Sequence, residues 1–455
     1  MSAKHKLFRN AALLTAAGFT SRIFGFLFRI FLSRSFGEES VGLYQMIFPL
    51  YVLCLSISTA GLQTAVSRIT AEKTALGQNE EAERVLKAAL CLAVGVSFIE
   101  ILVIQNLAEF ISVSFTGDAR CLDLILIISY ALPFAAVHSC ICGRSLGLGD
   151  AKLPAAGQLT EQAVRILTTV LLWLSLRASG LTPSIRLAAA GVVTGELAAA
   201  LYSILVLRRM SPVFCSPPAG RRRARGTFPR IRSSLRELLA FSVPLTANRT
   251  ALTLLQSIEA ASIPSCLIRY GMSAPEAVSM YGVLTGMALP CILFPSALTG
   301  SVGTVLLPAV SAASTSGNRQ SLFRLLRRAV GSCFALGLAC CLFFLIFGHM
   351  IGLVLFGSED AGRFIITLAW ICPFLYVNSS LLSAINGYGR TGSVFLISLA
   401  GLLIRITGVF LAVPRFGIRA YLWALLGAQL CTSVLASAVL IRLSGKITPS
   451  SETGR

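Results

Sequence analysis

Apolar stretches about as long as a bilayer is thick recur along the whole 455-residue chain. A helix needs about 20 apolar residues to cross the hydrocarbon core, where only helices and closed barrels satisfy their backbone polar groups. The runs here are long and poorly interrupted rather than alternating, which favours helices. With 55% hydrophobic residues, 13% charged residues and a mean hydropathy of +0.79, the sequence predicts an all-α polytopic membrane protein.

Polar interruptions divide these runs into about twelve expected spans. Lys and Arg favour alternate loops by roughly three to one, and cytoplasmic loops carry the excess of such residues. The bias predicts a multi-pass protein of the cell membrane with both termini in the cytoplasm. The expected span centres lie near residues 22, 55, 97, 131, 165, 197, 250, 291, 337, 375, 403 and 431.

The largest expected cytoplasmic loop is strongly basic and lies in the middle of the chain. From Arg208 to Arg236 it holds nine arginines and no acidic residue. Since the loop has no fold to present these charges, it favours contact with anionic lipid headgroups and not with nucleic acid. The sequence therefore predicts an N-terminal six-helix bundle at 1–209, a basic cytoplasmic linker at 210–236 and a C-terminal six-helix bundle at 237–455.

The two halves share a motif at a spacing of 240 residues. Pro133-Phe134 recurs as Pro373-Phe374, and Arg165-Ile166 recurs as Arg405-Ile406. An even number of spans in each half makes the two copies run in the same direction. This predicts a parallel repeat about an axis along the membrane normal, with a site near the midplane between the copies.

Two arginines interrupt the first expected span. Arg22 and Arg29 are seven residues apart, so in a helix they share one face, about 10 Å from each other. A charge near mid-membrane costs at least ~2.5 kcal/mol, so this face is expected to line protein or a water-filled cavity. Two interpretations stay open: the arginines bind an anion, or they pair with acidic residues and orient the helices.

Other intramembrane arginines extend the candidate site. Arg249 lies about as deep in the seventh expected span as Arg22 does in the first. Arg165 has Glu161 four residues before it, which predicts an ion pair on one helix, whereas its repeat equivalent Arg405 has no such local partner. The candidate substrate-binding residues are Arg22, Arg29, Arg249 and Arg405.

Three carboxylates in apolar surroundings are candidates for ion coupling. A lone carboxyl in a membrane span can carry a proton or help to bind a cation, although a core carboxylate with satisfied hydrogen bonds is the commoner case. These residues are Glu100, Glu196 and Glu259.

The cysteines and histidines form no recognisable metal or catalytic motif. Cys140-x-Cys142 and the pair Cys340-Cys341 lack metal-ligand spacing and histidine partners, and the three histidines are far apart in sequence. The thirteen cysteines are expected to be small packing residues. The sequence predicts no metal, no cofactor and no enzyme active site.

The first 70 residues hold a recognisable series of motifs: Thr20-Ser21-Arg22-Ile23-Phe24-Gly25-Phe26, Arg29, Phe36-Gly37, Val41-Gly42-Leu43-Tyr44-Gln45, Ser58-Thr59-Ala60-Gly61-Leu62 and Ser67-Arg68. This series resembles the opening of the stage V sporulation protein B family, bacterial members of the multidrug/oligosaccharidyl-lipid/polysaccharide (MOP) flippase superfamily. It is also similar, more distantly, to lipid II flippases, which usually have an aspartate after the second arginine and two further spans. Here that position is Ile30, and the expected spans number about twelve.

The resemblance implies a MATE-like fold and a flippase whose substrate is an isoprenoid-diphosphate-linked saccharide, a lipid II-like precursor of cell wall or spore cortex. The implied partners are membrane lipids and a coupling ion, proton or sodium. Guanidinium groups match the oxygens of a diphosphate, which agrees with two arginines on one face. One alternative is a cation-coupled multidrug and toxin extrusion antiporter, which would place carboxylates in its cavity. Another is a membrane scaffold for envelope assembly that transports nothing.

Overall fold

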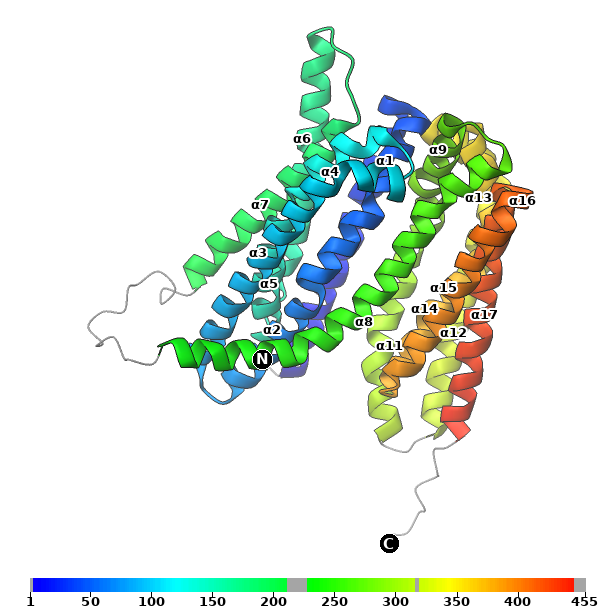
Figure 1. Cartoon of the computed structure of the whole chain (residues 1–455). Coiled ribbons are helices and arrows are strands. Elements are labelled where there is room, and N and C mark those ends of the chain that lie inside the picture. The colour runs from blue at the N-terminus through cyan, green and yellow to red at the C-terminus, as the bar shows by residue number, and fades with distance from the viewer. Residues whose placement is uncertain (1–2, 211–226, 316–318, 446–455) are drawn as a thin grey trace. The chain divides into compact units, whose positions relative to one another are not determined.

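The computed structural model describes residues 3–210, 227–315 and 319–445, and these are helical almost throughout, with no β-strand among them (Figure 1). The first elements are α1 (Ala3–Leu55), α2 (Gly61–Ala75), α3 (Asn79–Phe110), α4 (Leu122–Ser129), α5 (Leu132–Gly147), α6 (Lys152–Ala178) and α7 (Arg186–Met210). They are followed by α8 (Thr227–Tyr270), α9 (Ala274–Gly282), α10 (Leu289–Leu293), α11 (Ser296–Thr315) and α12 (Arg319–Ile351). The last are α13 (Glu359–Ala369), α14 (Cys372–Gly387), α15 (Thr391–Thr407), α16 (Val413–Phe416) and α17 (Ile418–Gly445).

Short turns of other helix types interrupt this series. Five are π-helical, a form that frees backbone carbonyls from the regular hydrogen-bond ladder. They are η1 (Ser56–Ala60), η2 (Ile111–Phe115), η5 (Val283–Ala288), η6 (Gly352–Phe356) and η7 (Gly408–Ala412), and η3 (Ala119–Cys121) is a 3₁₀ turn.

Nine helical segments of the described chain are long and apolar enough to cross a membrane, or eleven if each of two bent pairs is one span. The bent pairs are residues 119–129 with α5, at 43°, and α13 with α14, at 56°. The first segment, 12–75, includes two of the predicted span centres, and its 64 residues far exceed the roughly 20 that one crossing needs. The prediction of an all-α polytopic membrane protein is confirmed.

The chain forms two compact units. Unit 1 comprises Met1–Phe28 and Leu43–Ala261, and unit 2 comprises Arg29–Gly42 and Ser262–Arg455. The chain passes from one unit to the other inside α1 and inside α8. The division at 1–209, 210–236 and 237–455, which was drawn from the position of the basic loop, stays a prediction.

The predicted basic linker is only partly covered by the structure. Residues 211–226 lie outside the described residues. Residues 227–236, which were assigned to the linker, are helical, because α8 begins at Thr227.

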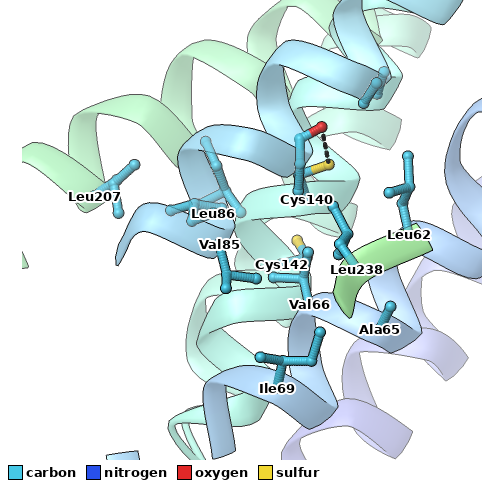
Figure 2. Packing of buried hydrophobic residues seen from close by; sticks show 14 of the residues in the cluster. Leu62, Ala65, Val66, Ile69, Val85, Leu86, Cys140, Cys142, Leu207 and Leu238 are labelled. Atoms are coloured by element: carbon cyan, nitrogen blue, oxygen red, sulfur yellow. Dashed lines mark hydrogen bonds between the residues drawn. The ribbon is translucent and has the colours of Figure 1, made fainter. Parts of the chain in front are cut away.

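The core of unit 1 surrounds α5, which packs on α2, α3 and α7. Fully buried side chains from four helices meet there, among them Val66 of α2, Leu86 of α3, Cys140 of α5 and Leu238 of α8 (Figure 2). Cys140 points its sulfur at the carbonyl oxygen of Ala89, 3.8 Å away. This cysteine therefore has the packing role that the sequence predicts.

The first half of α8 is fastened to α2 within unit 1. Glu237 lies 3.8 Å from the ammonium group of Lys73, and Arg68 places its guanidinium 4.4 Å from the ring centre of Phe241. Leu238, between these two contacts, is completely buried. An ion pair at the surface contributes at most about 1 kcal/mol, so the buried leucine is the main attachment.

Unit 2 has an equivalent core around α14, which packs on α11, α12 and α17. Its fully buried residues include Val310 of α11, Leu322 of α12, Ile385 of α14 and Ala436 of α17. Since α14 begins and ends 240 residues after α5, the helix at the centre of each core is the same element of the repeat.

The turns after α5 and α14 match bond for bond. The amide of Gly149 donates to Leu146 O and that of Gly389 donates to Asn386 O, both at 2.9 Å. Gly149 and Gly389 have φ values of 68° and 74°, a left-handed conformation that glycine adopts without steric cost. The local structure thus repeats at the spacing of 240 residues, and the rotation axis between the copies stays a prediction.

Asp118 lies in the short connection between η2 and α4, outside the membrane-spanning segments, and its hydrogen bonds hold this turn together. Its carboxylate accepts the backbone amide of Arg120 at 2.9 Å and the Arg120 guanidinium at 2.7 Å. Burial alone would raise the pKa of Asp118, but these bonds outweigh burial and hold the pKa below its ordinary value.

Candidate functional site

Arg22 lies in a regular part of α1 and is exposed. The one non-helical residue within α1 is Gly37, so the seven-residue spacing keeps Arg22 and Arg29 on the same helix face. They belong to different units, however, because the boundary falls between Phe28 and Arg29. The expected pair is therefore divided between the two compact bodies of the molecule.

Arg29 is half-buried in unit 2, where its Nη1 donates to the carbonyl oxygen of Thr285 at 3.1 Å. Thr285 lies in the π-helical turn η5, whose irregular hydrogen bonding leaves carbonyls available. Arg29 thus has a structural contact with the protein itself, so part of its guanidinium is already engaged. Pairing of these arginines with acidic residues stays a prediction, because the acceptor of this bond is a backbone carbonyl.

The α1 segment after Arg29 is held in unit 2 by a series of polar contacts that sequence reasoning missed. Ser33 donates to Phe356 O at 2.8 Å, and Arg34 donates to Leu355 O at 3.1 Å. The two acceptors end η6, where carbonyls have no partner further along the helix. In the sequence these contacts appear only as a serine and an arginine near the end of an expected span. That pattern does not indicate which residues they contact.

Two glycines allow α1 and α9 to approach closely next to these polar contacts. A Cβ at Gly42 would lie 2.1 Å from the carbonyl oxygen of Val278, and a Cβ at Gly282 would lie 2.5 Å from that of Glu38. Gly282 follows Gly42 by 240 residues, and Val278 follows Glu38 by the same number, so the close crossing of α1 and α9 is symmetric within the repeat. The Ser279 hydroxyl adds a 3.0 Å bond to the Glu38 carboxylate.

Arg249 is exposed on α8 in unit 1. Gln256, two turns further along, is exposed as well, whereas Ser242 is buried where α8 packs on Gly61 of α2. Arg22 and Arg249 are the two candidate arginines that unit 1 leaves exposed.

The remaining candidate arginine is less accessible. Arg405 is half-buried in α15 of unit 2, while its repeat equivalent Arg165 is bonded to Glu161 on α6. The predicted ion pair between Glu161 and Arg165 is therefore confirmed. The structure brings Arg405 into unit 2 and does not test its proposed contact with substrate.

The three carboxylates occupy different surroundings in unit 1. Glu100 lies beside Ser58 of η1, and neither of its enclosed oxygens has a hydrogen-bond partner among the described residues. Glu196 on α7 is 6% exposed and accepts a 2.9 Å hydrogen bond from Tyr51, a partner that the sequence did not predict. Glu259 on α8 is 1% exposed. The structure does not gather these carboxylates into one cluster, and the described chain contains no group of three or more ligand-type side chains placed to hold a metal.

Comparison with known proteins agrees with this architecture. The family described as polysaccharide biosynthesis protein matches residues 7–314. Stage V sporulation protein B of Bacillus subtilis (strain 168) is 26% identical over 452 residues, covering 97% of this chain and 85% of the relative. Lipid II flippase MurJ of the same organism is 25% identical over 417 residues, covering 84% of this chain and 73% of the relative.

Solved structures show the same fold at low identity. Lipid II flippase MurJ in an inward closed conformation superposes with a TM-score of 0.73 at 15% identity, covering 96% of this chain and 90% of that one. An inward-facing multidrug resistance MATE family transporter of the MOP superfamily gives 0.72 at 15% identity, covering 95% and 96%. The expected MATE-like MOP fold is confirmed.

Proposed function

Since the chain belongs to the polysaccharide biosynthesis protein family, we propose that it is a flippase for an isoprenoid-diphosphate-linked saccharide. The observation that carries this proposal is Arg22, an exposed arginine deep in a membrane helix. The relatives named above include a lipid II flippase, which supports a cell-wall or spore-cortex precursor as the substrate class.

An exposed guanidinium at this depth requires water or an anion beside it, because lipid hydrocarbon offers neither. A diphosphate is a compact anion whose oxygens accept paired hydrogen bonds from the planar guanidinium. Arg22 and Arg249 present this group from two different helices of unit 1. We expect both to contact the diphosphate, and Arg29 and Arg405 stay predicted substrate-binding residues.

The proposed cycle is alternating access, with both termini in the cytoplasm and the protein in the cell membrane. Moving a charged headgroup through hydrocarbon is prohibitively costly, so a cavity open to each side in turn is the physical solution. Glu100, Glu196 and Glu259 are the proposed coupling carboxylates, for a proton or a sodium ion. The chain then acts as a transporter and not as an enzyme.

The test is reconstitution in liposomes with a labelled lipid-linked saccharide, scoring the access of a membrane-impermeant reagent to the headgroup. Arg22→Ala and Arg249→Ala should each weaken binding of the lipid-linked saccharide by about ten- to hundredfold. This fold-change corresponds to the loss of one charge-assisted contact of roughly 1.5–3 kcal/mol. Arg22→Lys should restore part of the activity, because lysine keeps the charge and loses the planar fork.

The matched control is Arg9→Ala, which removes an exposed arginine near the start of the same helix. It should flip lipid normally. A well-folded Arg22→Ala/Arg249→Ala variant with normal flipping would exclude the anion-binding mechanism. Export of an organic cation by that same variant would instead support the antiporter, whose cavity does not need these arginines.

A further inference from the structure

Unit 2 has an exposed group of arginines at the end where α12 begins. Arg324, Arg327 and Arg328 lie on the first turns of this helix, and all three are exposed. Residues three and four apart are neighbours on a helix surface, so these guanidiniums share the face of α12 opposite to the buried Leu322 and Ala329. Like charges at this spacing repel one another, and an anion against this face therefore stabilises the helix.

The length of α12 places these arginines at the level of lipid phosphates. Residues 329–348 contain no charged residue and no histidine, and 20 helical residues span about 30 Å, the thickness of the hydrocarbon core. Arg328 therefore marks the edge of the hydrocarbon, and Arg324 lies about 6 Å beyond it. This is the headgroup layer of the membrane, in which the phosphates of phospholipids lie.

No described acidic residue lies at this end of unit 2. Glu359 and Asp360 begin α13, which follows the opposite end of α12. The other acidic residues in the described part of the unit, Glu38, Glu39 and Glu276, belong to α1 and α9 beside that same opposite end. The arginines at the start of α12 therefore have no carboxylate of their own unit to pair with.

The equivalent end of unit 1 shows that the fold does not impose this imbalance. Since α12 begins 240 residues after α3, residues 320–328 correspond to 80–88. The segment in unit 1 holds three glutamates and two cations, a net charge of −1, whereas the segment in unit 2 holds three arginines and no acidic residue, a net charge of +3. The glutamates form ion pairs within unit 1, Glu80 with Arg84 at 3.3 Å, Glu81 with Lys73 at 3.1 Å and Glu83 with Arg144 at 3.6 Å.

The neighbouring turn shows the same reversal of charge. The turns after α5 and α14 have matching hydrogen bonds, yet the residue after the left-handed glycine is Asp150 in unit 1 and Arg390 in unit 2. Arg390 is exposed, and its turn lies near the start of α12, because Leu322 packs in one buried cluster with Ile385 of α14. The end of α17 lies on the same side of unit 2 and adds the exposed Arg442 (Figure 1).

We propose that this end of unit 2 is a binding site for one anionic phospholipid, whose phosphate lies against Arg324, Arg327 and Arg328. Guanidinium groups bind phosphate oxygens in pairs, and the lipid supplies the negative charge that glutamates supply in unit 1. The predicted topology places the start of α12 at the cytoplasmic leaflet, which carries the anionic lipids. The site does not depend on the proposed function, because it lies at the membrane surface and includes none of the candidate substrate-binding arginines.

The test measures binding of fluorescent phosphatidylglycerol to the purified full-length chain in neutral-detergent micelles, with no lipid-linked saccharide present. Phosphatidylcholine, which has no net charge, is the comparison lipid. Phosphatidylglycerol should bind at least about tenfold more tightly, and salt at about 1 M should weaken this preference by screening. Arg324→Gln/Arg327→Gln should reduce the affinity for phosphatidylglycerol by at least about tenfold, because charge-assisted contacts are lost.

The matched control is Arg84→Gln/Lys87→Gln, which removes two cations from the equivalent turns of α3 and should leave lipid binding unchanged. A second variant, Gln320→Glu, keeps every arginine. It places a carboxylate one turn before Arg324, as Glu80 is placed before Arg84 in unit 1, so it should also weaken binding of phosphatidylglycerol.

Three results would overturn the proposal: no preference for phosphatidylglycerol, unchanged binding in folded Arg324→Gln/Arg327→Gln, or an equal loss in the control variant. Displacement of the lipid by inorganic phosphate would assign the site to a free anion and overturn it as well. Flipping is measured separately, since no saccharide substrate is present in the binding assay. Lost lipid binding with normal flipping leaves the proposed function intact, and failure to flip with normal lipid binding leaves this site intact.

Discussion

Replacing Gly42 with alanine should separate two helices of unit 2. The added Cβ would lie 2.1 Å from the Val278 carbonyl oxygen, whereas ordinary contact begins at 3.4 Å, a shortfall of about 1.3 Å. The obstructing atom is backbone, so no side chain can rotate away to make room. The helix carrying Gly42 must therefore move relative to α9.

The cost can be estimated from packing data. Forcing extra atoms into a packed core costs about 1–3 kcal/mol, and a backbone obstruction belongs at the upper end. Alanine returns about 1 kcal/mol through its better helix propensity. The expected net loss is about 2 kcal/mol, which for a unit of about two hundred residues lowers the melting temperature by roughly 4–8 °C.

The assay is thermal unfolding of the purified protein in detergent, followed by loss of the monodisperse peak. Gly427→Ala on α17 is the matched control, because no atom lies within 4 Å of its added Cβ. It should melt at the parent temperature or slightly above. If Gly42→Ala melts like Gly427→Ala, the close crossing does not exist in the molecule.

The repeat-related glycine supplies a second measurement. Gly282→Ala should cost a similar amount, since its Cβ would lie 2.5 Å from the Glu38 carbonyl oxygen. Once the helices are apart, the second substitution meets less resistance, so the double variant should lose less than the sum of the two single losses. Strict additivity would place the two glycines in independent contacts.

Three further predictions concern topology, pH and the attachment of α8. Reporter fusions after Arg232 should read cytoplasmic and fusions near Asp360 external, because basic loops stay inside; an external Arg232 would reverse the span assignment. The depressed pKa of Asp118 stabilises the fold at neutral pH, and this stabilisation is lost as pH falls below the ordinary carboxyl pKa of about 3.9 and through the folded-state pKa, so Asp118→Asn should lower the melting temperature more at about pH 7 than at about pH 3. Lys73→Ala should cost at most about 1 kcal/mol and Leu238→Ala about 2–5 kcal/mol, and the reverse order of melting temperatures would refute the buried attachment.

Sequence reasoning recovered the features that depend on local pattern. Apolar run length gave the helices, and the placement of Arg22 and Arg29 on one face follows from helix geometry alone. The ion pair between Glu161 and Arg165 was predictable for the same reason, because its partners are one helical turn apart.

Contacts between distant segments were not predictable in this way. Nothing near Arg29 in sequence indicates Thr285 as an acceptor, and nothing near Glu196 indicates Tyr51, because both partners are brought close only by packing of the whole unit. Gly42 and Gly282 did offer a signal, since they have the spacing of the repeat. A repeated glycine in a helix marks a close approach, although the sequence does not say to what.

The assignment of Arg29–Gly42 to unit 2 has a consequence for biosynthesis. This segment leaves the ribosome roughly two hundred residues before Ser262, the point at which the rest of its unit begins. Unit 2 therefore cannot fold as an independent C-terminal body. Ser33, Arg34 and Gly42 lack their final partners while the rest of unit 1 is translated. Insertion of the first helix and completion of unit 2 are thus linked events, because residues 29–42 reach their native contacts only after partners such as Val278 and Phe356 have been synthesised.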